Sequence, residues 1–271
     1  MFLAVNIGNT NIQMGLFSGK KLICCLVFPT FKKPKRNYYK AIRQNLSQFK
    51  NIEAIAICSV VPSLTKPFQK LFKKYLKIDP LIITEKLNLG IKLNYKKNQL
   101  GADRIANAVG AHYLYKKGCI VVDLGTAITF DVISSKGAYL GGAIAPGIDI
   151  SSKALFSGTN LPEIKNLDNT KFAIGKNTSE NLQIGILFGF SSMIEGILDK
   201  FKKELKSRIV RRAGARVKPR IVRRAGARAL IILTGGDAAL ISKKTNFSHI
   251  VNPFITLEGI RIIYEKNKIK Y

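Results

Sequence analysis

Two short segments of the chain carry residue types that could bind a phosphate group. Asn6-Ile-Gly-Asn-Thr10 and Asp123-Leu-Gly-Thr126 each follow an apolar run and combine a glycine with hydroxyl or amide side chains. Glycine lets backbone N–H groups approach an anion, Thr10 and Thr126 add hydroxyl donors, and Asp123 can hold a cation. A plain hairpin turn has the same pattern. We therefore expect two strand-turn-strand units, whose turns are hairpins with or without a phosphate cradle.

A third segment, Gly101-Ala-Asp-Arg104, stands at the start of an apolar periodic run that continues through Ile105, Val109 and Tyr113. This spacing predicts a helix with Asp103 in its first turn. The helix dipole stabilises a carboxylate there, and the free N–H groups attract an anion. An ordinary acidic first turn followed by a surface arginine gives the same pattern, so the segment alone does not decide between the two.

The elements around these residues alternate between strand and helix patterns, which predicts an α/β protein. We expect strands at residues 2–5, 12–17, 53–61, 80–84, 119–122, 127–133 and 230–233. We expect helices from about 37 to 48, after a cap at Ser63, from Asp103, and after a cap at Asn177 with Glu180 three residues later. The strand at 230–233 ends in Thr234-Gly-Gly236, where the glycines leave room for a flat ring.

Composition limits the class of protein. A chain of 271 residues that is 46% hydrophobic can bury two cores of ordinary domain size. We find no apolar run long enough to span a bilayer and no signal peptide at the N-terminus, so we expect a cytoplasmic protein without a membrane partner. The four cysteines show no C-x-x-C spacing and no nearby histidine, which favours buried thiols over a zinc site.

The formal net charge of +29 raises the question of nucleic-acid binding. Part of it comes from residues 208–228, where the unit Arg-Ile-Val-Arg-Arg-Ala-Gly-Ala-Arg occurs twice; the rest of the chain still carries +20. The excess lysine is spread along the sequence, and no zinc finger, RRM signature or basic heptad helix is present, so we expect no dedicated nucleic-acid partner. Two copies are too few for a solenoid, and we interpret the repeat as an inserted loop.

The order and spacing of the motifs across nearly the whole chain resemble the type III pantothenate kinase family. The matching segments are Asn6-Ile-Gly-Asn-Thr10, Gly101-Ala-Asp-Arg104, Asp123-Leu-Gly-Thr-Ala-Ile-Thr129, Gly141-Gly-Ala-Ile-Ala-Pro-Gly147, Gly175-Lys-Asn-Thr178, Thr234-Gly-Gly236 and Pro253-Phe-Ile-Thr-Leu-Glu-Gly259. The resemblance implies an α/β fold of the actin-like superfamily, with two ribonuclease-H-like domains whose mixed sheets are flanked by helices. We expect these domains at residues 1–115 and 116–271, with 208–228 inserted in the second.

The resemblance also implies a reaction, the transfer of the ATP γ-phosphoryl group to pantothenate, which gives 4′-phosphopantothenate at the start of coenzyme A synthesis. It implies Asp103 as the base and Arg104 as the partner of the pantothenate carboxylate. Asp123 is implied to hold a monovalent cation, K⁺ or NH₄⁺, and Mg²⁺ accompanies ATP. ATP contacts are implied at Asn6, Ile7, Gly8, Asn9, Thr10, Asn11, Ile12, Gln13, Thr126, Gly235 and Gly236, and pantothenate contacts at Tyr95, Gly101, Ala102, Asp103, Arg104 and Thr178.

Two features qualify this expectation. In the family the residue at Thr178 contacts substrate in the partner subunit's site, so the resemblance implies a homodimer. At Asn6 the family pattern has an aspartate, and the amide keeps one carbonyl acceptor but loses the charge. Losing a charged group at a metal–phosphate site commonly slows phosphoryl transfer. The alternatives are therefore a catalytically impaired member that acts as a binding or regulatory protein, and a kinase for a different sugar or acid on the same scaffold.

Overall fold

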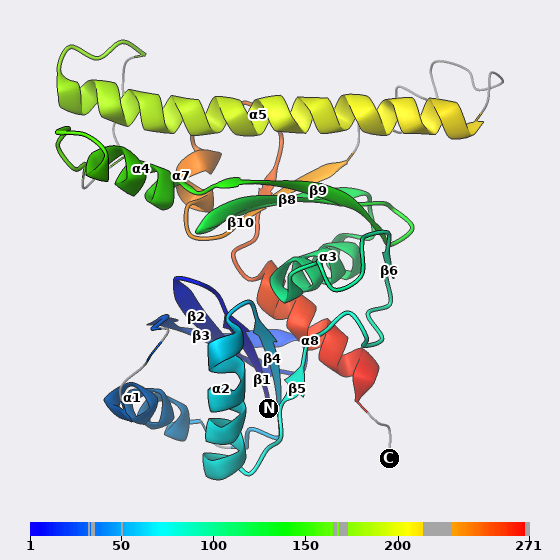
Figure 1. Cartoon of the computed structure of the whole chain (residues 1–271). Coiled ribbons are helices and arrows are strands. Elements are labelled where there is room, and N and C mark those ends of the chain that lie inside the picture. The colour runs from blue at the N-terminus through cyan, green and yellow to red at the C-terminus, as the bar shows by residue number, and fades with distance from the viewer. Residues whose placement is uncertain are drawn as a thin grey trace. The chain divides into compact units, whose positions relative to one another are not determined.

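The computed structural model describes residues 1–31, 33, 36–49, 51–164, 167, 173–213 and 229–268. The chain forms two compact units (Figure 1). The first unit comprises Met1–Lys116, Ile133–Gly141 and Phe254–Tyr271, and the second comprises Lys117–Val132 and Gly142–Pro253. The expected boundary after residue 115 divides the chain into two continuous segments. The compact units are not continuous in sequence, because the C-terminal segment belongs to the first unit.

The first unit is built on a five-stranded sheet with the order β3-β2-β1-β4-β5. These strands are β1 (Phe2–Ile7), β2 (Asn11–Ser18), β3 (Lys21–Pro29), β4 (Ala54–Ser59) and β5 (Leu81–Ile82). The first three form antiparallel hairpins, and β4 lies parallel to β1. Every residue of β1 from Leu3 to Val5 is buried, as a strand covered on both faces requires. The helices of this unit are α1 (Arg36–Ser47), α2 (Pro62–Tyr75), α3 (Ala102–Tyr115) and α8 (Ile255–Asn267).

Helices α3 and α8 pack against each other at very short range. A Cβ on Gly259 would collide with the backbone of Ala106, and one on Gly110 would lie 2.5 Å from the carbonyl oxygen of Ile255. Nearby, the Thr256 hydroxyl donates to Oδ1 of buried Asn107 at 2.6 Å. Because only glycine lets two backbones approach so closely, these positions fix how α3 lies on the first unit, and with it the residues of its first turn.

The second unit contains most of a six-stranded sheet with the order β11-β10-β7-β8-β9-β6. Its strands are β7 (Cys119–Leu124), β8 (Ala127–Ile133), β9 (Ala138–Pro146), β10 (Leu230–Thr234) and β11 (Ile250–Val251). The short strand β6 (Lys92–Leu93) pairs in parallel with the first residues of β9, which belong to the first unit. The helices are α4 (Ile148–Ser157), α5 (Thr178–Ala213) and α7 (Ala238–Ser242). Helix α5 lies along the sheet, and Phe201 packs edge-on against Phe130 of β8 (Figure 1).

The two sheets repeat one topology. Apart from the short edge strand β6, the first strand of each sheet is followed by two strands on one side of it and then by two on the other, so the order in both is third, second, first, fourth, fifth. The fourth strand is parallel to the first in both, as β4 is to β1 and β10 is to β7. The expected α/β architecture of two related halves with mixed sheets flanked by helices is thereby confirmed.

Three local expectations changed. Ser63 does not cap its helix: α2 begins at Pro62 after Val61, without a side-chain cap. The expected loop at 208–228 begins as helix, because α5 continues to Ala213, and residues 214–228 lie outside the described residues. The expectation that no apolar run is long enough for a bilayer is qualified, since Thr178–Ser207 of α5 is a candidate span by length and composition alone. A long helix of a soluble protein meets the same criterion.

Candidate functional site

The turn after β1 is a tight hairpin. The Gly8 N–H donates to the carbonyl oxygen of Asn11 at 3.0 Å, and the Thr30 hydroxyl donates to the carbonyl oxygen of Gly8 at 2.8 Å. A Cβ on Gly8 would lie only 3.0 Å from that Asn11 oxygen, so the turn favours glycine. Asn9 and Thr10 are exposed at its tip. The hairpin interpretation is confirmed, and the polar tip is open to an anion.

Asn6 lies immediately before this turn with an unused acceptor. Its Oδ1 atom is buried and has no hydrogen-bond partner among the described residues. A buried carbonyl oxygen without a partner costs free energy, so such an atom is expected to be satisfied by a ligand, an ion or a water molecule. In the sheet Asn6 pairs with Gln13 on one side and with Cys58 on the other. The Asn6 side chain is therefore placed to contact a hydrated cation or a molecule that donates a phosphate group.

Asp103 occupies the first turn of α3, as predicted. Its Oδ1 accepts a hydrogen bond from the Arg104 backbone N–H at 2.7 Å. Burial raises the pKa of this carboxyl above its ordinary value of 3.8, although the Arg104 N–H and the Arg104 charge oppose the change. Burial also raises the pKa of the Cys58 thiol, with a further contribution from the charge of Asp103. The structure thus brings Asn6, Cys58 and Asp103 into one neighbourhood of the first unit.

Arg104 and Tyr95 both lie against the ring of a third residue, Tyr139. The Arg104 guanidinium lies 6.0 Å from the centroid of the Tyr139 ring, and the Tyr95 ring meets the same ring edge-on at 5.7 Å. Arg104 is only 6% exposed and Tyr139 is fully buried, whereas Tyr95 is 39% exposed. An arginine held in a largely buried place by a ring has its fork pre-oriented for a carboxylate.

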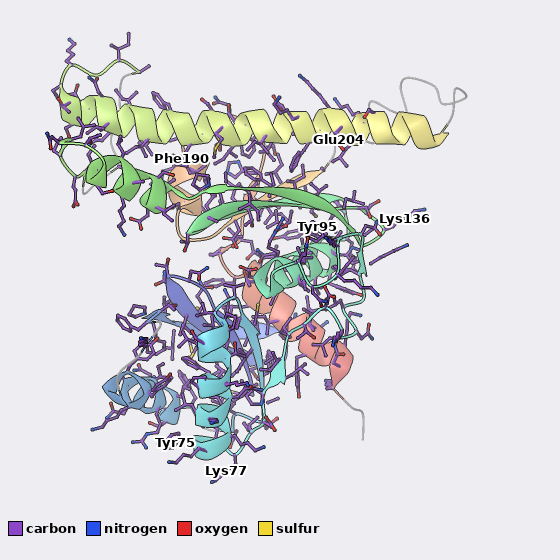
Figure 2. All side chains as sticks on the ribbon, viewed as in Figure 1. Tyr75, Lys77, Tyr95, Lys136, Phe190 and Glu204 are labelled. Carbon is purple, nitrogen blue, oxygen red and sulfur yellow. The ribbon has the colours of Figure 1, made fainter. Side chains whose placement is uncertain are left out.

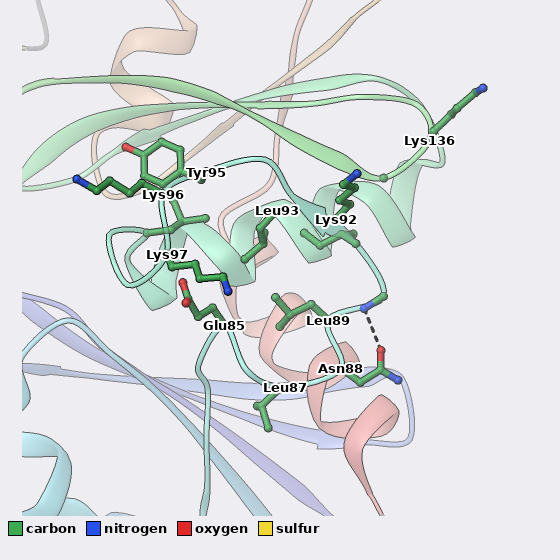
Figure 3. A pocket seen from close by; sticks show the side chains of 14 residues that line it. Glu85, Leu87, Asn88, Leu89, Lys92, Leu93, Tyr95, Lys96, Lys97 and Lys136 are labelled. Carbon is green, nitrogen blue, oxygen red and sulfur yellow. Dashed lines mark hydrogen bonds between the residues drawn. The ribbon is translucent and has the colours of Figure 1, made fainter.

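Tyr95 also lines a cavity of about 520 Å³ in the first unit. Figure 3 shows its ring at one end of this cavity, with Leu89 and Leu93 on the wall and the ammonium groups of Lys92 and Lys136 toward the rim. Gly90 closes another part of the wall through the hydrogen bond from its N–H to Asn88 Oδ1 (Figure 3). Glu85 also lines the cavity, but four lysines, Lys92, Lys96, Lys97 and Lys136, outnumber it, so the net positive charge suits a small organic anion.

The second unit carries the other cradle. Asp123 of β7 pairs in register with Thr234 of β10, so the two residues end adjacent parallel strands. The carboxyl ends of such strands are the usual ligand-binding edge of an α/β sheet. Gly235 has φ +90°, and a Cβ there would lie 2.6 Å from Asp123 Oδ1. A side chain at Gly147 would collide with the backbone of Gly125 and Thr126. Glycines thus keep the surroundings of Asp123 and Thr126 free of side chains.

Asp237 adds a second carboxylate beside this cradle. Its backbone N–H donates to the carbonyl oxygen of Leu124 at 3.1 Å, which ties it to the turn after β7. Burial raises the pKa of Asp237, and the charge of Asp149 raises it further. Among the described residues no group of three or more His, Cys, Asp or Glu side chains forms a ready metal cluster. The donors of the second unit therefore suit a cation that takes part of its coordination from a ligand or water.

Thr178 is the first residue of α5 and is exposed. The expected cap is confirmed, because Asn177 Oδ1 accepts from the Glu180 N–H at 2.9 Å. Glu180 Oε2 in turn accepts from the Lys176 N–H at 2.8 Å, one residue earlier than in the usual capping box. Helix capping therefore fixes the place of Thr178 on the second unit.

Sequence reasoning missed three residues that the structure adds to these sites. Cys58 is fully buried next to Asn6, and only the parallel pairing of β4 with β1 reveals it. Tyr139 stands two residues before the glycine-rich segment at 141–147, which was its only signal. Asp237 directly follows the glycine pair and could have been chosen as a carboxylate at a strand end.

Comparison with solved structures agrees with the fold. A crystal structure named for the Baf family of transcriptional activators, from Campylobacter jejuni, aligns with a TM-score of 0.60 at 22% identity, covering 98% of both chains. The ethanolamine utilization protein EutJ from Carboxydothermus hydrogenoformans aligns with a TM-score of 0.51 at 14% identity, covering 96% of this chain and 89% of its own. Identities this low show similarity of fold alone, and both neighbours share the fold described above over nearly the whole chain.

Comparison of sequences is more specific. The family model described as type III pantothenate kinase matches residues 2–200. A type III pantothenate kinase from Moorella thermoacetica is 38% identical over 98% of this chain and 100% of its own length. One from Dehalococcoides mccartyi strain CBDB1 is 36% identical over 98% of this chain and 96% of its own length. The chain therefore belongs to the type III pantothenate kinase family.

Proposed function

We propose that Asp103 is the catalytic base with which this pantothenate kinase activates its substrate. The observation that carries the proposal is a half-buried carboxylate in the first turn of α3, directly followed by the guanidinium of Arg104. The primary hydroxyl of pantothenate gives its proton to Asp103 as its oxygen bonds to the γ-phosphorus of ATP. The bond from that phosphorus to the bridging oxygen breaks, and ADP leaves. Phosphoryl transfer requires mainly positioning and charge neutralisation, which these groups supply.

We infer that Arg104 and Tyr95 bind pantothenate. The planar guanidinium can donate two parallel hydrogen bonds to the pantothenate carboxylate, and it lies 6.0 Å from the centroid of the Tyr139 ring. Tyr95 has an exposed ring that can cover the substrate chain. Gly101 and Ala102 complete the contact, since a side chain at Gly101 would lie 2.6 Å from Asp103 Oδ1 and displace the carboxylate.

We infer two groups of ATP contacts, one in each unit. In the first unit they are the residues Asn6 to Gln13, where the hairpin turn offers backbone N–H groups, the Thr10 hydroxyl and the buried Asn6 oxygen. In the second unit they are Thr126 and the glycine pair Gly235 and Gly236, where a Cβ on Gly236 would meet nothing within 4 Å. That open glycine surface suits the adenosine part of the nucleotide.

The family uses ATP, and with it a divalent metal such as Mg²⁺. The donors fit these ions, because the unpartnered Asn6 oxygen and the carboxylate of Asp123 are hard oxygen ligands. We propose that Asp123 also holds a monovalent cation, K⁺ or NH₄⁺, on the second unit. When bound, these cations neutralise phosphate charge. The chain's own contribution is to keep Asn6 and Asp123 oriented toward them.

Asn6 is the position where activity is most in question. An amide oxygen at this place keeps an acceptor for a metal-bound water, while an aspartate would add a full charge. The comparisons give no support to the alternative of an impaired binding or regulatory protein. We propose that Asn6 serves with its neutral oxygen and that Asn6→Asp increases turnover.

We propose a homodimer in which α5 packs on the α5 helix of a second copy. Gly185, Gly189 and Gly196 are spaced to share one helix face, and an added Cβ at each would meet nothing within 4 Å. Only 28% of the most apolar stretch of this helix is buried. Glu195 accepts a hydrogen bond from the Asn246 N–H of its own unit, and Asp199 pairs with Lys202; these charges on α5 favour a protein partner over a bilayer. A dimer of this kind would present Thr178 near its partner.

We further propose a cytoplasmic location, as for other metabolic kinases of this family, and functional domains divided near residue 115 as the motif order suggests. Neither proposal affects the chemistry above. The location is tested by fractionating cells that express the chain and locating it in the soluble or the membrane fraction.

The deciding experiment measures pantothenate-dependent ADP release by the purified chain with ATP, Mg²⁺ and either K⁺ or NH₄⁺. We expect turnover in the native chain, a loss of about 10²- to 10⁴-fold in Asp103→Asn, as removal of a general base gives, and a gain in Asn6→Asp. Asp79→Asn, an exposed carboxylate on the first unit, serves as the control. Unchanged turnover in Asp103→Asn would contradict the assigned base, and a silent native chain with an active Asn6→Asp would restore the impaired alternative.

A further inference from the structure

A basic groove lies between α1 and α2 on the first unit, away from every residue assigned above. It has a volume of about 740 Å³. Its lining residues are Tyr39, Lys40, Arg43, Lys66, Pro67, Lys70, Leu71, Lys74 and Tyr75. Five of these nine carry positive charge and none carries negative charge. Figure 1 shows the two helices that form its walls, and Figure 2 shows Tyr75 at the end of α2.

The charges are arranged in two rows. Lys66, Lys70 and Lys74 follow each other at every fourth residue of α2, so they share one face and extend over about 12 Å at the rise of an α-helix. Across the groove Lys40 and Arg43 lie one turn apart on α1. Two facing rows of cations match a linear polyanion lying along the groove better than they match a single small anion.

The protein itself does not neutralise these rows. Within the described residues none of the five groove cations forms an ion pair, whereas their neighbour Lys73, outside the groove, pairs with Asp79 at 3.1 Å. Five positive charges gathered without a carboxylate repel each other, and repulsion of this kind is relieved by an anionic partner.

The groove also offers flat surfaces. Tyr75 is 44% exposed, and the Arg43 guanidinium lies 4.8 Å from its ring centroid. The Tyr39 ring is held edge-on against Phe68 at 5.8 Å, and Leu71 and Pro67 complete an apolar floor. Aromatic rings and an arginine plane beside a basic track are the elements with which proteins bind single strands, the cations meeting phosphates and the flat groups meeting bases.

We propose that this groove binds single-stranded nucleic acid, with successive phosphates between the two rows and a base against Tyr75 and Arg43. A concave groove does not fit the flat surface of a bilayer, and an acidic peptide or polyphosphate would leave the flat surfaces without a matching group. The sequence predicts no such partner because its lysines are spread along the chain. Folding brings five cations from α1 and α2 together, which linear spacing does not reveal.

The test is fluorescence anisotropy with the full chain and a labelled single-stranded RNA of about twelve nucleotides, a length within the range of single-strand sites. The groove variant replaces Lys66, Lys70 and Lys74 by Gln. The control replaces Lys20, Lys21 and Lys86 by Gln, which removes the same charge from exposed positions outside the groove. We expect the groove variant to bind the RNA at least tenfold more weakly at ~0.15 M salt. The slope of log K against log salt should become less negative by about 2. The control should match the native chain.

A second variant, Tyr75→Leu, separates base contact from charge. We expect RNA binding to weaken about 5- to 150-fold, the value of one stacked base, while binding of inorganic polyphosphate stays unchanged. Equal weakening of the groove and control variants would overturn the proposal in favour of diffuse attraction. The proposal would also be overturned if the groove variant kept its affinity for RNA and lost only its binding of polyphosphate, polyglutamate or phosphatidylserine vesicles. Thermal unfolding and pantothenate-dependent turnover, which should stay native-like, show whether each variant is folded.

Discussion

Asp103, the proposed base, shows how a position suited to catalysis can lower stability. Its carboxylate must be ionised to accept a proton, yet burial raises its pKa and so disfavours the ionised form. A raised pKa also brings a base closer to working pH, where it accepts a proton more effectively. The same burial therefore makes the carboxylate a better base and lowers the stability of the folded first unit.

The cost of this arrangement depends on pH in a defined direction. Because the folded chain holds the Asp103 proton more tightly than the unfolded chain, the stability from this group is present below the ordinary pKa of 3.8 and is lost as pH rises through the raised pKa. We expect Asp103→Asn to unfold at a higher temperature than the native chain at neutral pH, and at nearly the same temperature at the acid end. Calorimetry at several pH values checks this, and Asp79→Asn should show no comparable gain at neutral pH. A destabilised Asp103→Asn would refute the argument.

Arg104 allows a prediction on binding. Replacing it by Lys keeps the charge but removes the planar fork that we propose to bind two carboxylate oxygens of pantothenate, and the ammonium fits less well against Tyr139. We expect the KM for pantothenate to rise about 10- to 100-fold, which corresponds to one charged hydrogen bond, while the KM for ATP stays close to native. Steady-state kinetics with each substrate varied in turn measures both. A rise in the KM for ATP alone would assign Arg104 to the nucleotide.

At this scale the sequence predicts residues that stand in recognisable segments and fails where contacts join distant strands. Asp103 and Arg104 follow from a helix-start pattern, and Asp123 from a strand end. Cys58 lies 52 residues after Asn6 and becomes its neighbour only through the β1–β4 pairing. Tyr139 is reached from Arg104 only through tertiary packing. Neither contact leaves a local mark in the sequence.

Among the elements, helix α3 depends on its contact with α8. Gly110 and Gly259 let the two backbones approach within a distance that no side chain would permit. Since the base and the arginine lie in the first turn of α3, a shift of this helix would move both. The packing of α8 therefore helps to position the proposed site.

We expect Gly259→Ala to destabilise the chain by about 1–3 kcal/mol, the usual cost of overpacking a well-filled contact. Turnover should fall as well, because α3 must move to admit the methyl group. Ser63→Ala in α2 is the control, because Ser63 is exposed and does not cap its helix, so the change should alter stability by no more than about 0.5 kcal/mol. Urea unfolding at one protein concentration compares the two. A neutral Gly259→Ala would show that the α3–α8 contact is loose.

Secondary structure was largely predictable because its signals are local. The alternating or continuous apolar runs gave the strands, and Asn177 with Glu180 gave the start of α5. Ser63 misled because Pro62 already suits the first turn of a helix, and the nearby hydroxyls of Ser59 and Thr65 bond to each other at 2.9 Å instead. The pairing of strands into sheets came from the resemblance, since sheet order depends on contacts far apart in sequence.

At the scale of the whole molecule, the repeated sheet order supports two related halves, each ending its central strand in a glycine turn. The proposed pairing of α5 helices would join two such chains. We expect Gly189→Glu to convert a dimer into a monomer, because a charged side chain would enter the face where helices meet. Sedimentation velocity measures this, with Ser18→Glu on the first unit as a control of equal charge. A native chain that sediments as a monomer would refute the dimer.

The assignment of α8 to the first unit has a consequence for biosynthesis. The ribosome makes β1 to α3 first, yet the helix that packs against α3 is nearly the last part of the chain to emerge. Nascent domains usually fold in the order in which they are made. Here the first unit must wait, with its apolar sheet incompletely covered, until translation has passed through the whole second unit. A premature stop before Phe254 would retain every proposed catalytic and binding residue and still yield a chain that aggregates.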